Sequence, residues 1–487
     1  MMKTLNLHAS ARKTAALATA LATALALALG VAATTPAHAY TVSGTRILDD
    51  AGKPVPLRGV NWFGFETPDG TVHGLWARNW KEMIDQIQAS GFNAVRVPVC
   101  PATFRGEGSP PGGVINSNLN PDLVGLKSRQ WLDVFLTELD RRGIYILLDH
   151  HRPDCQAISE LWYTPAYSEA RWLDDLDYLA QHYSGLRNLV GLDLKNEPHG
   201  AATWGTGNVQ TDWNLAAERA AQRILAVNPK LLIFVEGIAT NPVCSGNQGI
   251  FWGGNLEPLK CKPLDIPRNK LVLSPHVYGP DVFNQSYFDA PNFPANMPAI
   301  WDAHFGQFAR DYPVVLGEAG GKYGHGGSPK DKIWQDALVD YLKPRGMTGL
   351  FYWSWNPNSG DTGGILQDDW TTVWPDKLAL LQRLWDGGTT TPPTNPPNPP
   401  TTPPGAVTAT LKTNSDWGAG YCADVTVSNA GTQPAQWNVQ LTVAGTINNL
   451  WGAVWNQAGT TLTATGQSHN ATVQPGGTQN FGFCATR

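Results

Sequence analysis

The sequence predicts a (β/α)8 barrel followed by a small β-sandwich, and three features of the chain support this α/β fold class. From residue 40 to about residue 385, short apolar segments alternate with longer amphipathic segments, as in βα units around a parallel sheet. Residues 387–405 then consist of Pro, Thr, Gly and Asn, a composition that cannot bury a core. From residue 406 onward, apolar and polar residues alternate between Gly, Asn and Pro turns, which is typical of an antiparallel sandwich.

Eight segments have the length and apolar character of barrel strands. They are residues 57–64, 93–99, 145–151, 190–198, 231–237, 271–278, 314–320 and 349–356. The segments 80–90, 129–142 and 212–227 between them have apolar residues at helical spacing and end at a Gly or near a Pro. Eight such units in roughly 345 residues fit a closed barrel with enlarged loops.

The first 39 residues have the character of a secretory signal peptide. A basic start precedes an Ala- and Leu-rich run, and the small-x-small sequence Ala37-His38-Ala39 stands before Tyr40. A retained membrane anchor is the alternative, but the run is rich in Ala and no stop-transfer segment follows it. We therefore expect a secreted, extracellular protein. Its four parts are a signal peptide (1–39), a barrel (40–386), a linker (387–405) and a sandwich (406–487).

Composition argues for a neutral partner with flat rings. Only 15% of the residues are charged, whereas 20 are Trp, and flat aromatic faces suit sugar rings. The net charge is −5, and cleavage of the signal peptide would remove three positive charges and leave −8. This balance argues against nucleic acid or an anionic membrane surface as a partner. We expect a monomer that acts on a polysaccharide.

The six cysteines would meet an oxidising compartment after export. Cys422 and Cys484 are the two cysteines of the sandwich, so we expect them to pair. Cys100 follows the second predicted strand and Cys155 the third, and we pair them because these loops are neighbours in a barrel, leaving Cys244 with Cys261. Four cysteines allow three pairings, so the barrel pairs remain open. No C-x-x-C or matching Cys/His spacing occurs, and we expect no metal and no organic cofactor.

Polar side chains collect at the carboxyl ends of the predicted strands, where a parallel barrel assembles its active site. These residues are Arg96, His150, His151, Asn196, Glu197, Glu236, His276, Tyr278, Glu318, Trp353 and Trp355. Scattered structural polar residues would show no preference for one end. A structural ion pair is the alternative for any one carboxylate, and Glu236 lacks the amide neighbour that Glu197 has.

Period-two alternation limits which of these side chains can share a face. His150 and His151 point to opposite faces of their strand, and we expect His151 to face the cleft. The same alternation groups Asp193, Lys195 and Glu197 and places Asn196 on the other face. For Asn196 also to reach a substrate, the strand must bulge or end at that point.

Two carboxyls at one rim suit glycosidic bond cleavage with retention. This reaction needs an acid and a nucleophile roughly 5 to 5.5 Å apart. Glu197 and Glu318 end the fourth and seventh predicted strands and can face each other across the barrel mouth. Both cannot easily be ionised at that distance, so one pKa should rise and that residue becomes the acid.

Several motifs in this order carry a family resemblance. They are FNAVRVP with Arg96, DHHRPD at 149–154, Asn196-Glu197-Pro198, His276-x-Tyr278, Leu316-Gly317-Glu318 and YWSWNPNSGDTGG. Residues 40 to about 385 resemble glycoside hydrolase family five of clan A, and within it the bacterial endo-β-1,4-glucanases. The resemblance implies Glu197 as acid/base and Glu318 as nucleophile. It further implies Asn196 on the sugar 2-hydroxyl, Arg96 and Tyr278 against Glu318, His276 near Glu197, and His151 and Trp353 at the subsite of cleavage.

Further aromatic residues are candidates for sugar stacking. In the barrel these are Trp76, Trp162, Trp204, Trp252 and Trp355, together with Trp62, for each of which core packing is the alternative. The sandwich resembles a family two carbohydrate-binding module. That resemblance implies Trp417 and Trp451 as exposed stacking residues and Trp437 in the core, with His469 at the third platform position.

The sequence thus predicts a secreted, retaining endo-β-1,4-glucanase with an appended cellulose-binding module. The alternative substrates of the same barrel are mannan, xylan and xyloglucan, because loop residues decide among polymers. A carbohydrate-binding protein with an inactive barrel is the alternative from another class. It fits poorly, because an inactive site has no need of both Glu197 and Glu318.

Overall fold

The computed structural model describes residues 39–240, 243, 251–385, 407–467 and 470–487. They form two compact units, divided between residues 390 and 391, and each unit is described by itself. The expected signal peptide, apart from Ala39, and the expected linker lie outside the described residues. Within the described ranges, no helix has the length and apolar character needed to cross a bilayer.

The first unit is built on a closed parallel sheet. Its strands are β3 (Arg58–Asn61), β4 (Ala94–Val99), β5 (Tyr145–His150), β6 (Leu189–Asp193), β7 (Leu232–Val235), β8 (Leu271–Leu273), β9 (His276–Tyr278), β10 (Val315–Gly320) and β11 (Gly349–Tyr352). Their order is β8-β7-β6-β5-β4-β3-β11-β10-β9. Strands β8 and β9 are two halves of one strand, interrupted at Ser274 and Pro275. The sheet therefore closes into a barrel of eight strands. The predicted (β/α)8 barrel is confirmed.

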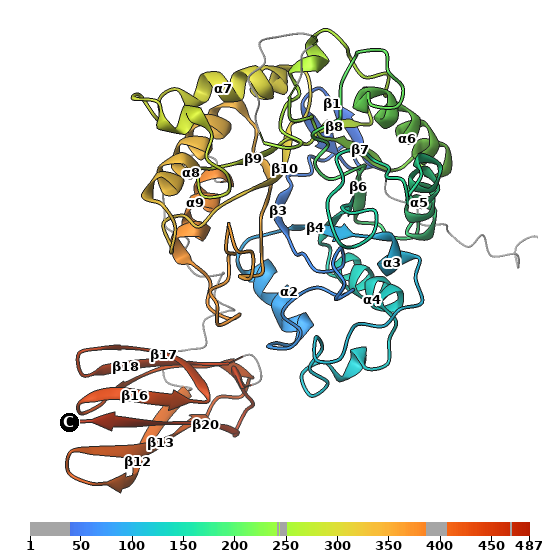
Figure 1. Cartoon of the computed structure of the whole chain (residues 1–487). Helices are drawn as coiled ribbons and strands as arrows, with labels where there is room; N and C mark the ends of the chain where they lie inside the picture. Colours follow the sequence, from blue (N-terminus) through green and yellow to red (C-terminus); the bar gives the residue numbers. More distant parts are fainter. Residues whose placement is uncertain (1–38, 241–242, 244–250, 386–406, 468–469) are drawn as a thin grey trace, which may run out of the picture. The chain divides into compact units, whose positions relative to one another are not determined.

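Helices surround the strands (Figure 1). They are α2 (Trp80–Ala89), α3 (Pro101–Phe104), α4 (Ser128–Arg141), α5 (Glu169–His182), α6 (Trp213–Val227), α7 (Met297–His304), α8 (Pro329–Leu342) and α9 (Pro375–Trp385). Short 3-10 turns are η1 (Pro121–Leu123), η2 (Glu257–Lys260), η3 (Ser286–Asp289), η4 (Gly306–Arg310) and η5 (Lys343–Arg345). Each long helix turns an apolar face to the sheet; in α2 this face is Trp80, Met83, Ile84 and Ile87. The Asn79 side chain caps α2 by accepting hydrogen bonds from the N–H groups of Lys81 and Glu82.

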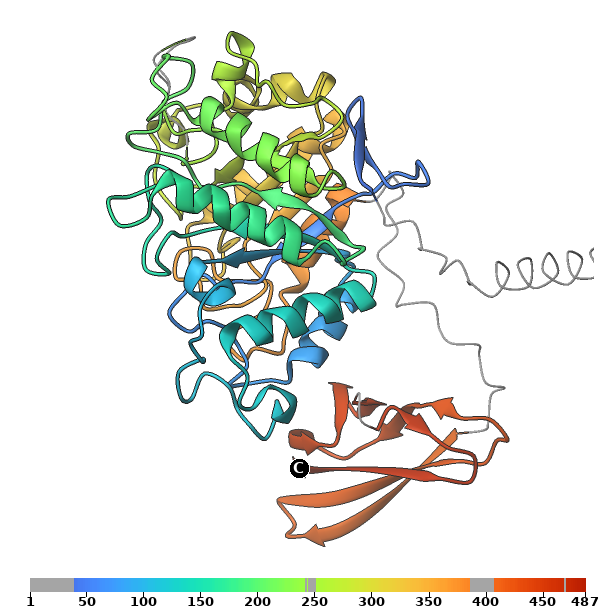
Figure 2. The ribbon, with the colours of Figure 1, turned by 90° about the vertical axis from the view of Figure 1, so that its right-hand side faces the viewer.

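A hairpin of β1 (Thr41–Ser43) and β2 (Arg46–Leu48) covers one end of the barrel (Figure 2). The Tyr40 N–H donates to the Lys230 carbonyl at 3.0 Å, and Val42 and Ile47 join an apolar cluster with inward-facing strand residues. Those strand residues include Ala94, Leu147 and Phe234. This end of the barrel is therefore apolar and closed.

The barrel interior changes from apolar to polar along the strands. Two residues after Ala94 comes Arg96, and two after Phe234 comes Glu236, and both polar side chains are fully buried. Since alternate residues of a strand point inward, these side chains stack above the apolar layer. The polar end is thus the carboxyl end of the strands, opposite the hairpin.

The second unit is a β-sandwich. One sheet pairs β12 (Val407–Asp416), β13 (Gly420–Asn429), β20 (Thr478–Thr486) and β16 (Thr446–Trp451) in that order. The other pairs β15 (Asn438–Thr442), β18 (Thr461–Gly466) and β17 (Ala453–Ala458), and a short ribbon joins β14 (Ala435–Gln436) to β19 (Thr472–Val473). The buried core contains Val425, Trp437, Leu462 and Phe483. The predicted sandwich is confirmed.

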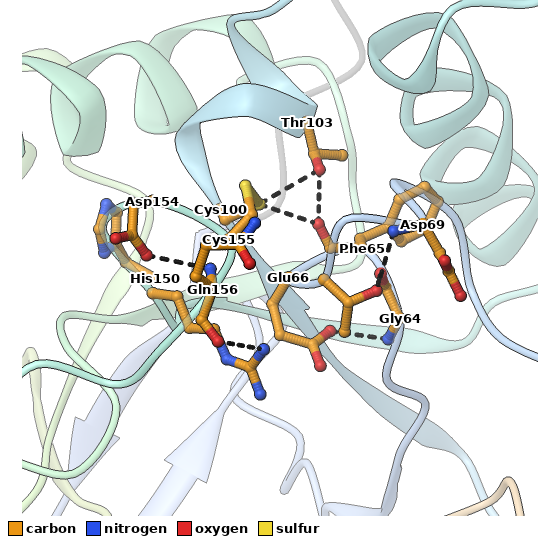
Figure 3. Close-up of a disulfide and its surroundings, with 12 residues drawn as sticks. Gly64, Phe65, Glu66, Asp69, Cys100, Thr103, His150, Asp154, Cys155 and Gln156 are labelled. Atoms are coloured by element: carbon orange, nitrogen blue, oxygen red, sulfur yellow. Dashed lines mark hydrogen bonds between the residues drawn. A yellow bond between two sulfur atoms is a disulfide. The ribbon is translucent and has the colours of Figure 1, made fainter. Parts of the chain in front are cut away.

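Two of the expected disulfides are present. Cys100 precedes α3 and Cys155 lies in the loop after β5, and their bond joins the ends of two neighbouring strands (Figure 3). Cys422 and Cys484 are paired residues of β13 and β20. The expected Cys244–Cys261 pair cannot be followed, because Cys244 lies outside the described residues.

Candidate active site

The fourth barrel strand, β6, ends before Asn196 and Glu197, the two residues that the sequence analysis identified as candidates. Strand β6 stops at Asp193, and Glu197 has a φ of 54°, in the left-handed region that a non-glycine residue seldom adopts. This turn of the backbone ends the period-two alternation. Asn196 and Glu197 therefore both line the same cleft.

Glu197 and Glu318 face each other in this cleft. A carboxylate oxygen of each, together with a ring nitrogen of His276, lies in a group whose atoms are all within 4.8 Å of one another. Glu318 is brought inward by a register shift in β10 between Leu316 and Ala319. The spacing suits a pair of carboxyls that act on one anomeric carbon, and it leaves no room for the intervening water of an inverting enzyme.

Glu318 is held by donors on both of its oxygens. The Arg96 guanidinium donates through Nη1 to Oε1 at 2.7 Å, and the Tyr278 hydroxyl donates to Oε2 at 2.5 Å. Both contacts favour a carboxylate with a fixed orientation. A nucleophile needs this ionised, oriented state.

Glu197 has a different environment. The pKa of its carboxyl is raised to about 7, chiefly by burial; His276 acts to lower this pKa, and the nearby Glu318 and Glu236 carboxylates act to raise it. The Nδ1 atom of His276 lies 3.2 Å from Glu197 Oε1. Glu197 is therefore suited to carry a proton near neutral pH.

Arg96 is the centre of the buried charge network. Nε donates to Asp193 Oδ2 at 3.1 Å, Nη2 to Asn196 Oδ1 at 3.0 Å, and Nη2 lies 3.1 Å from Asp149 Oδ2. Burial acts to lower the pKa of Arg96, but the surrounding carboxylates outweigh it and hold that pKa well above its ordinary value. Arg96 thus remains a cation and orients Asn196 as well as Glu318.

Asn196 lines the cleft, and its amide nitrogen is unpaired among the described residues. Its oxygen is used by Arg96, whereas Nδ2 is buried and has no hydrogen-bond partner among the described residues. A buried donor without an acceptor costs about 1–3 kcal/mol. A hydroxyl of a bound ligand would supply that acceptor.

His151 and Trp353 form one wall of the cleft. His151 Nδ1 lies 2.6 Å from Asp149 Oδ2, and its ring stacks on Trp353 with centroids 5.8 Å apart. Burial lowers the pKa of His151 well below its usual value, so the ring is neutral. His150 points away from the cleft, with Nε2 2.8 Å from the Tyr167 hydroxyl. The Trp353 ring also stacks on Phe63 at 5.3 Å.

The cleft encloses about 500 Å³ and continues past the carboxyls to exposed aromatic residues. Trp252 is 46% exposed and stacks on His199 with ring centroids 3.7 Å apart, and Phe283 is 65% exposed. Trp76 is half-buried against His73 and Trp370. Of the predicted stacking residues, Trp252 is the one that lines the cleft.

For three residues the predicted role in sugar stacking is wrong, because their side chains are buried. Trp162, Trp204 and Trp355 are 2%, 0% and 0% exposed. Trp162 Nε1 donates to Glu169 and Trp204 Nε1 to the Lys262 carbonyl, whereas Trp355 Nε1 is buried without a hydrogen-bond partner among the described residues. The buried Trp62 belongs to the same core. Sequence position beside a rim loop did not distinguish a core indole from an exposed one.

Sequence reasoning also missed Phe283, which lines the cleft, and His199, which stacks on Trp252 there. Phe283 and His199 had no motif to mark them, although His199 directly follows Asn196-Glu197-Pro198. Two triads have metal-like spacing, Asp193–Glu236–His276 and Glu197–His276–Glu318. In each triad the Arg96 guanidinium already forms an ion pair with one carboxylate, Asp193 in the first and Glu318 in the second. A cationic side chain therefore already neutralises a carboxylate that a metal ion would bind.

In the sandwich, the predicted platform residues are exposed. Trp417 and Trp451 are 56% and 46% exposed, and Trp437 is buried with Nε1 donating to the Asn470 carbonyl at 2.6 Å. Gly420 and Gly482 leave room for the Trp417 and Trp451 rings to lie on the strands of one sheet. His469 lies outside the described residues.

Comparison with known proteins agrees with this geometry. Residues 48–359 match the family described as Cellulase (glycosyl hydrolase family 5), and residues 407–487 match a cellulose binding domain. The major extracellular endoglucanase of Xanthomonas campestris pv. campestris is 57% identical over 464 residues, which cover 92% of this chain and 95% of that protein. A solved structure of the catalytic domain of the major endoglucanase from that organism has 62% identity and a TM-score of 0.70, covering 71% of this chain and 99% of that one.

A variant of the endocellulase from Pyrococcus horikoshii, crystallised in complex with cellotetraose, is 49% identical with a TM-score of 0.70 and covers 72% of this chain and all of that one (100%). The chain belongs to glycosyl hydrolase family 5, the cellulase family, and carries a C-terminal cellulose binding domain. It is a glycoside hydrolase.

Proposed function

We propose that the protein hydrolyses internal β-1,4-glucosidic bonds of cellulose with retention, using Glu318 as nucleophile and Glu197 as acid/base. The observation that carries this proposal is a pair of carboxyls with one oxygen of each within 4.8 Å of the other, of which Glu318 accepts hydrogen bonds from Arg96 and Tyr278 and Glu197 has a pKa of about 7. Two chemically identical groups in different environments can take the two roles of a double displacement.

In the first step, a Glu318 oxygen attacks the anomeric carbon and the bond from that carbon to the glycosidic oxygen breaks. Glu197 gives its proton to the departing oxygen. In the second step, the Glu197 carboxylate removes a proton from water, the water oxygen attacks the anomeric carbon, and the bond to Glu318 breaks. The enzyme returns to its starting state with no other reactant.

The surrounding residues support this reaction. Arg96 and Tyr278 orient Glu318. The unpaired Asn196 Nδ2 is suited to bind the sugar 2-hydroxyl, a contact that strengthens in the transition state. His151 and Trp353 form the wall of the subsite at the point of cleavage, and Trp252 offers a ring face to the next sugar.

Cellulose is the proposed polymer because the family, the appended domain and the relatives point the same way. The relatives are named endoglucanases or an endocellulase, and one of them binds cellotetraose. Trp417 and Trp451 give the sandwich a ring-stacking face. The protein acts outside the cell, as its extracellular relative does, as a monomer and without a nucleic acid or membrane partner.

The test compares two variants on two soluble substrates. On cellotetraose, both Glu197→Gln and Glu318→Gln should lose nearly all activity. On 2,4-dinitrophenyl β-cellobioside, whose leaving group needs no proton, Glu197→Gln should still form the glycosyl-enzyme, whereas Glu318→Gln should not. Mass spectrometry of the trapped intermediate would identify the residue that is modified. The reverse pattern would exchange the two roles, and product release from mannan or xylan in place of cellulose would refute the polymer.

A further inference from the structure

Glu236 is a buried carboxylate at the end of β7 that the proposed reaction does not use. It is 0% exposed, and its oxygens face hydrogen-bond donors in different directions. Oε2 accepts the backbone N–H of Glu197 at 2.8 Å, and Oε1 lies 3.1 Å from His276 Nε2 and 3.5 Å from Arg96 Nη2. A buried carboxylate is costly, so this arrangement requires an explanation.

The backbone contact fixes an unfavourable conformation. Glu197 is held at a φ of 54°, and such a conformation costs of order 1–3 kcal/mol in a non-glycine residue. In this conformation the Glu197 N–H donates to Glu236 Oε2 at 2.8 Å. This buried hydrogen bond therefore supports the turn that carries the acid/base side chain into the cleft.

The second contact reaches the Glu197 side chain through His276. Nδ1 of that ring lies 3.2 Å from Glu197 Oε1, while Nε2 faces Glu236 at 3.1 Å, at an angle that departs from good hydrogen-bond geometry. Burial acts to lower the pKa of His276, but Glu236, Glu318 and Glu197 around the ring outweigh it and hold that pKa well above its usual value. Both ring nitrogens therefore carry protons, and Glu236 beside Nε2 helps to hold the ring with Nδ1–H toward Glu197 Oε1.

The loop opposite is shaped around the same carboxylate. Gly253 has a φ of 67°, and any side chain there would collide with Glu236 Oε2. Its N–H donates to the Pro198 carbonyl, and its own carbonyl accepts the Gly237 N–H at 2.8 Å. The chain thus approaches Glu236 as closely as glycine allows and braces the residue after Glu197.

We propose that Glu236 is a positioning residue for the acid/base, which clamps the Glu197 backbone with one oxygen and directs His276 toward the Glu197 carboxyl with the other. This proposal rests on the acid/base role proposed for Glu197. It goes beyond that role because it assigns the orientation of the proton donor to a residue that touches neither substrate nor the reacting atoms.

Both side-chain oxygens of Glu236 are needed as acceptors, because every partner of Glu236 is a donor. In Glu236→Gln, the amide oxygen can accept from one donor, but the NH2 group must then face the others. We expect kcat/KM on cellotetraose to fall about 10- to 100-fold, since acid catalysis contributes roughly 10²- to 10⁴-fold and only part of it is lost. On 2,4-dinitrophenyl β-cellobioside, kcat/KM should change by less than about threefold, because that leaving group departs without a proton.

Glu66→Gln is the matched control. Glu66 is 1% exposed, accepts the Gly64 N–H at 2.7 Å, and burial raises its pKa to about 7, compared with about 8 for Glu236. It lies beside the Cys100–Cys155 disulfide, outside the proposed machinery (Figure 3). Its loss should change activity on both substrates by the same factor.

The substrate dependence separates the outcomes. An equal loss on both substrates in Glu236→Gln, or no loss on cellotetraose, would overturn the positioning role. If Glu236→Gln does not fold, as judged by its thermal transition, Glu236→Asp replaces it. This variant keeps the carboxyl group but reaches only one partner, and the same selective loss on cellotetraose is expected. Glu197→Gln is measured alongside. If Glu197→Gln also loses both substrates equally, the acid/base assignment itself fails, whereas selectivity in Glu197→Gln alone would refute only the role of Glu236.

Discussion

Glu197 and Glu318 are the same residue type at the same rim, and their neighbours make them chemically different. Arg96 and Tyr278 donate to Glu318, whereas Glu197 is buried beside like charges. Sequence reasoning predicted the pair and a raised pKa on one member. It could not decide how Asn196 and Glu197 reach the same cleft, because a left-handed φ leaves no trace in a period-two pattern.

Glu236 shows the limit of motif reasoning at the scale of single residues. Nothing beside Glu236 in the chain marks it, and its partners Glu197 and His276 lie 39 and 40 residues away. Only the closure of the barrel brings these groups together. Closure of the barrel also brings together His199 and Trp252, whose stacked rings belong to loops that follow two different strands.

The pH dependence should report the proton on Glu197. Its pKa of about 7 means that the acid is protonated below that pH and ionised above it. We expect kcat/KM on cellotetraose to fall about tenfold for each pH unit above 7, since the acid form is needed in the first step. The groups facing Glu197 are His276, Glu236 and Glu318.

The control for this pH profile is Glu197→Gln on 2,4-dinitrophenyl β-cellobioside. In this variant the alkaline decline of the first step should disappear, because no proton is donated. A decline of the same size and midpoint would assign it to another group, of which Glu236 with a pKa of about 8 is the nearest candidate.

At the scale of elements, the sequence predicted which segments form strands, but it did not predict where those strands end. The predicted strand 190–198 stops at Asp193, and the predicted strand 271–278 is divided at Ser274 and Pro275. Apolar runs identify the middle of a strand, because packing in the core determines the structure there. The end of a strand depends instead on contacts with the neighbouring strand. The burial of Trp162, Trp204 and Trp355 was not predicted for a similar reason. Whether a loop beside the rim folds back into the core also depends on contacts that a short sequence segment does not show.

The exposed and buried indoles should respond differently to truncation. Trp252→Ala removes a ring face from the cleft, and we expect KM for cellotetraose to rise about three- to tenfold, because stacking of this kind contributes about 0.5–1.5 kcal/mol. Trp204→Ala opens a cavity in the core and should lower the unfolding free energy by about 3–5 kcal/mol. Steady-state kinetics and denaturant unfolding distinguish the two. A normal KM in Trp252→Ala would remove it from the substrate path.

The Cys100–Cys155 disulfide joins the loops after two neighbouring strands and closes a 55-residue separation. Loss of such a crosslink typically costs about 2–4 kcal/mol. The double variant Cys100→Ser/Cys155→Ser should therefore lower the barrel's unfolding transition in calorimetry. Cys422→Ser/Cys484→Ser, with a separation of 62 residues, should lower only the sandwich transition. A shift of both transitions by either variant would mean that the two units do not unfold independently.

At the scale of the whole molecule, the sequence predicted both folds because each depends on a pattern repeated many times. Eight apolar segments separated by amphipathic ones specify a parallel barrel, and regular alternation specifies a sandwich. Errors in single strand ends do not change that count. The two units have separate cores, each containing its own aromatic residues.

Separate cores imply separable roles, which deletion of residues 406–487 tests. Turnover of soluble carboxymethylcellulose should stay within about twofold, because the cleft lies wholly in the barrel. Binding to insoluble cellulose in a pull-down should fall about tenfold or more, since a tethered binding unit raises the effective concentration at the surface. Trp417→Ala/Trp451→Ala in the full chain is the matched control and should reproduce the binding loss without removing the fold. If the deletion instead abolished turnover of the soluble polymer, the barrel would depend on the sandwich, and division of labour between the two units would be refuted.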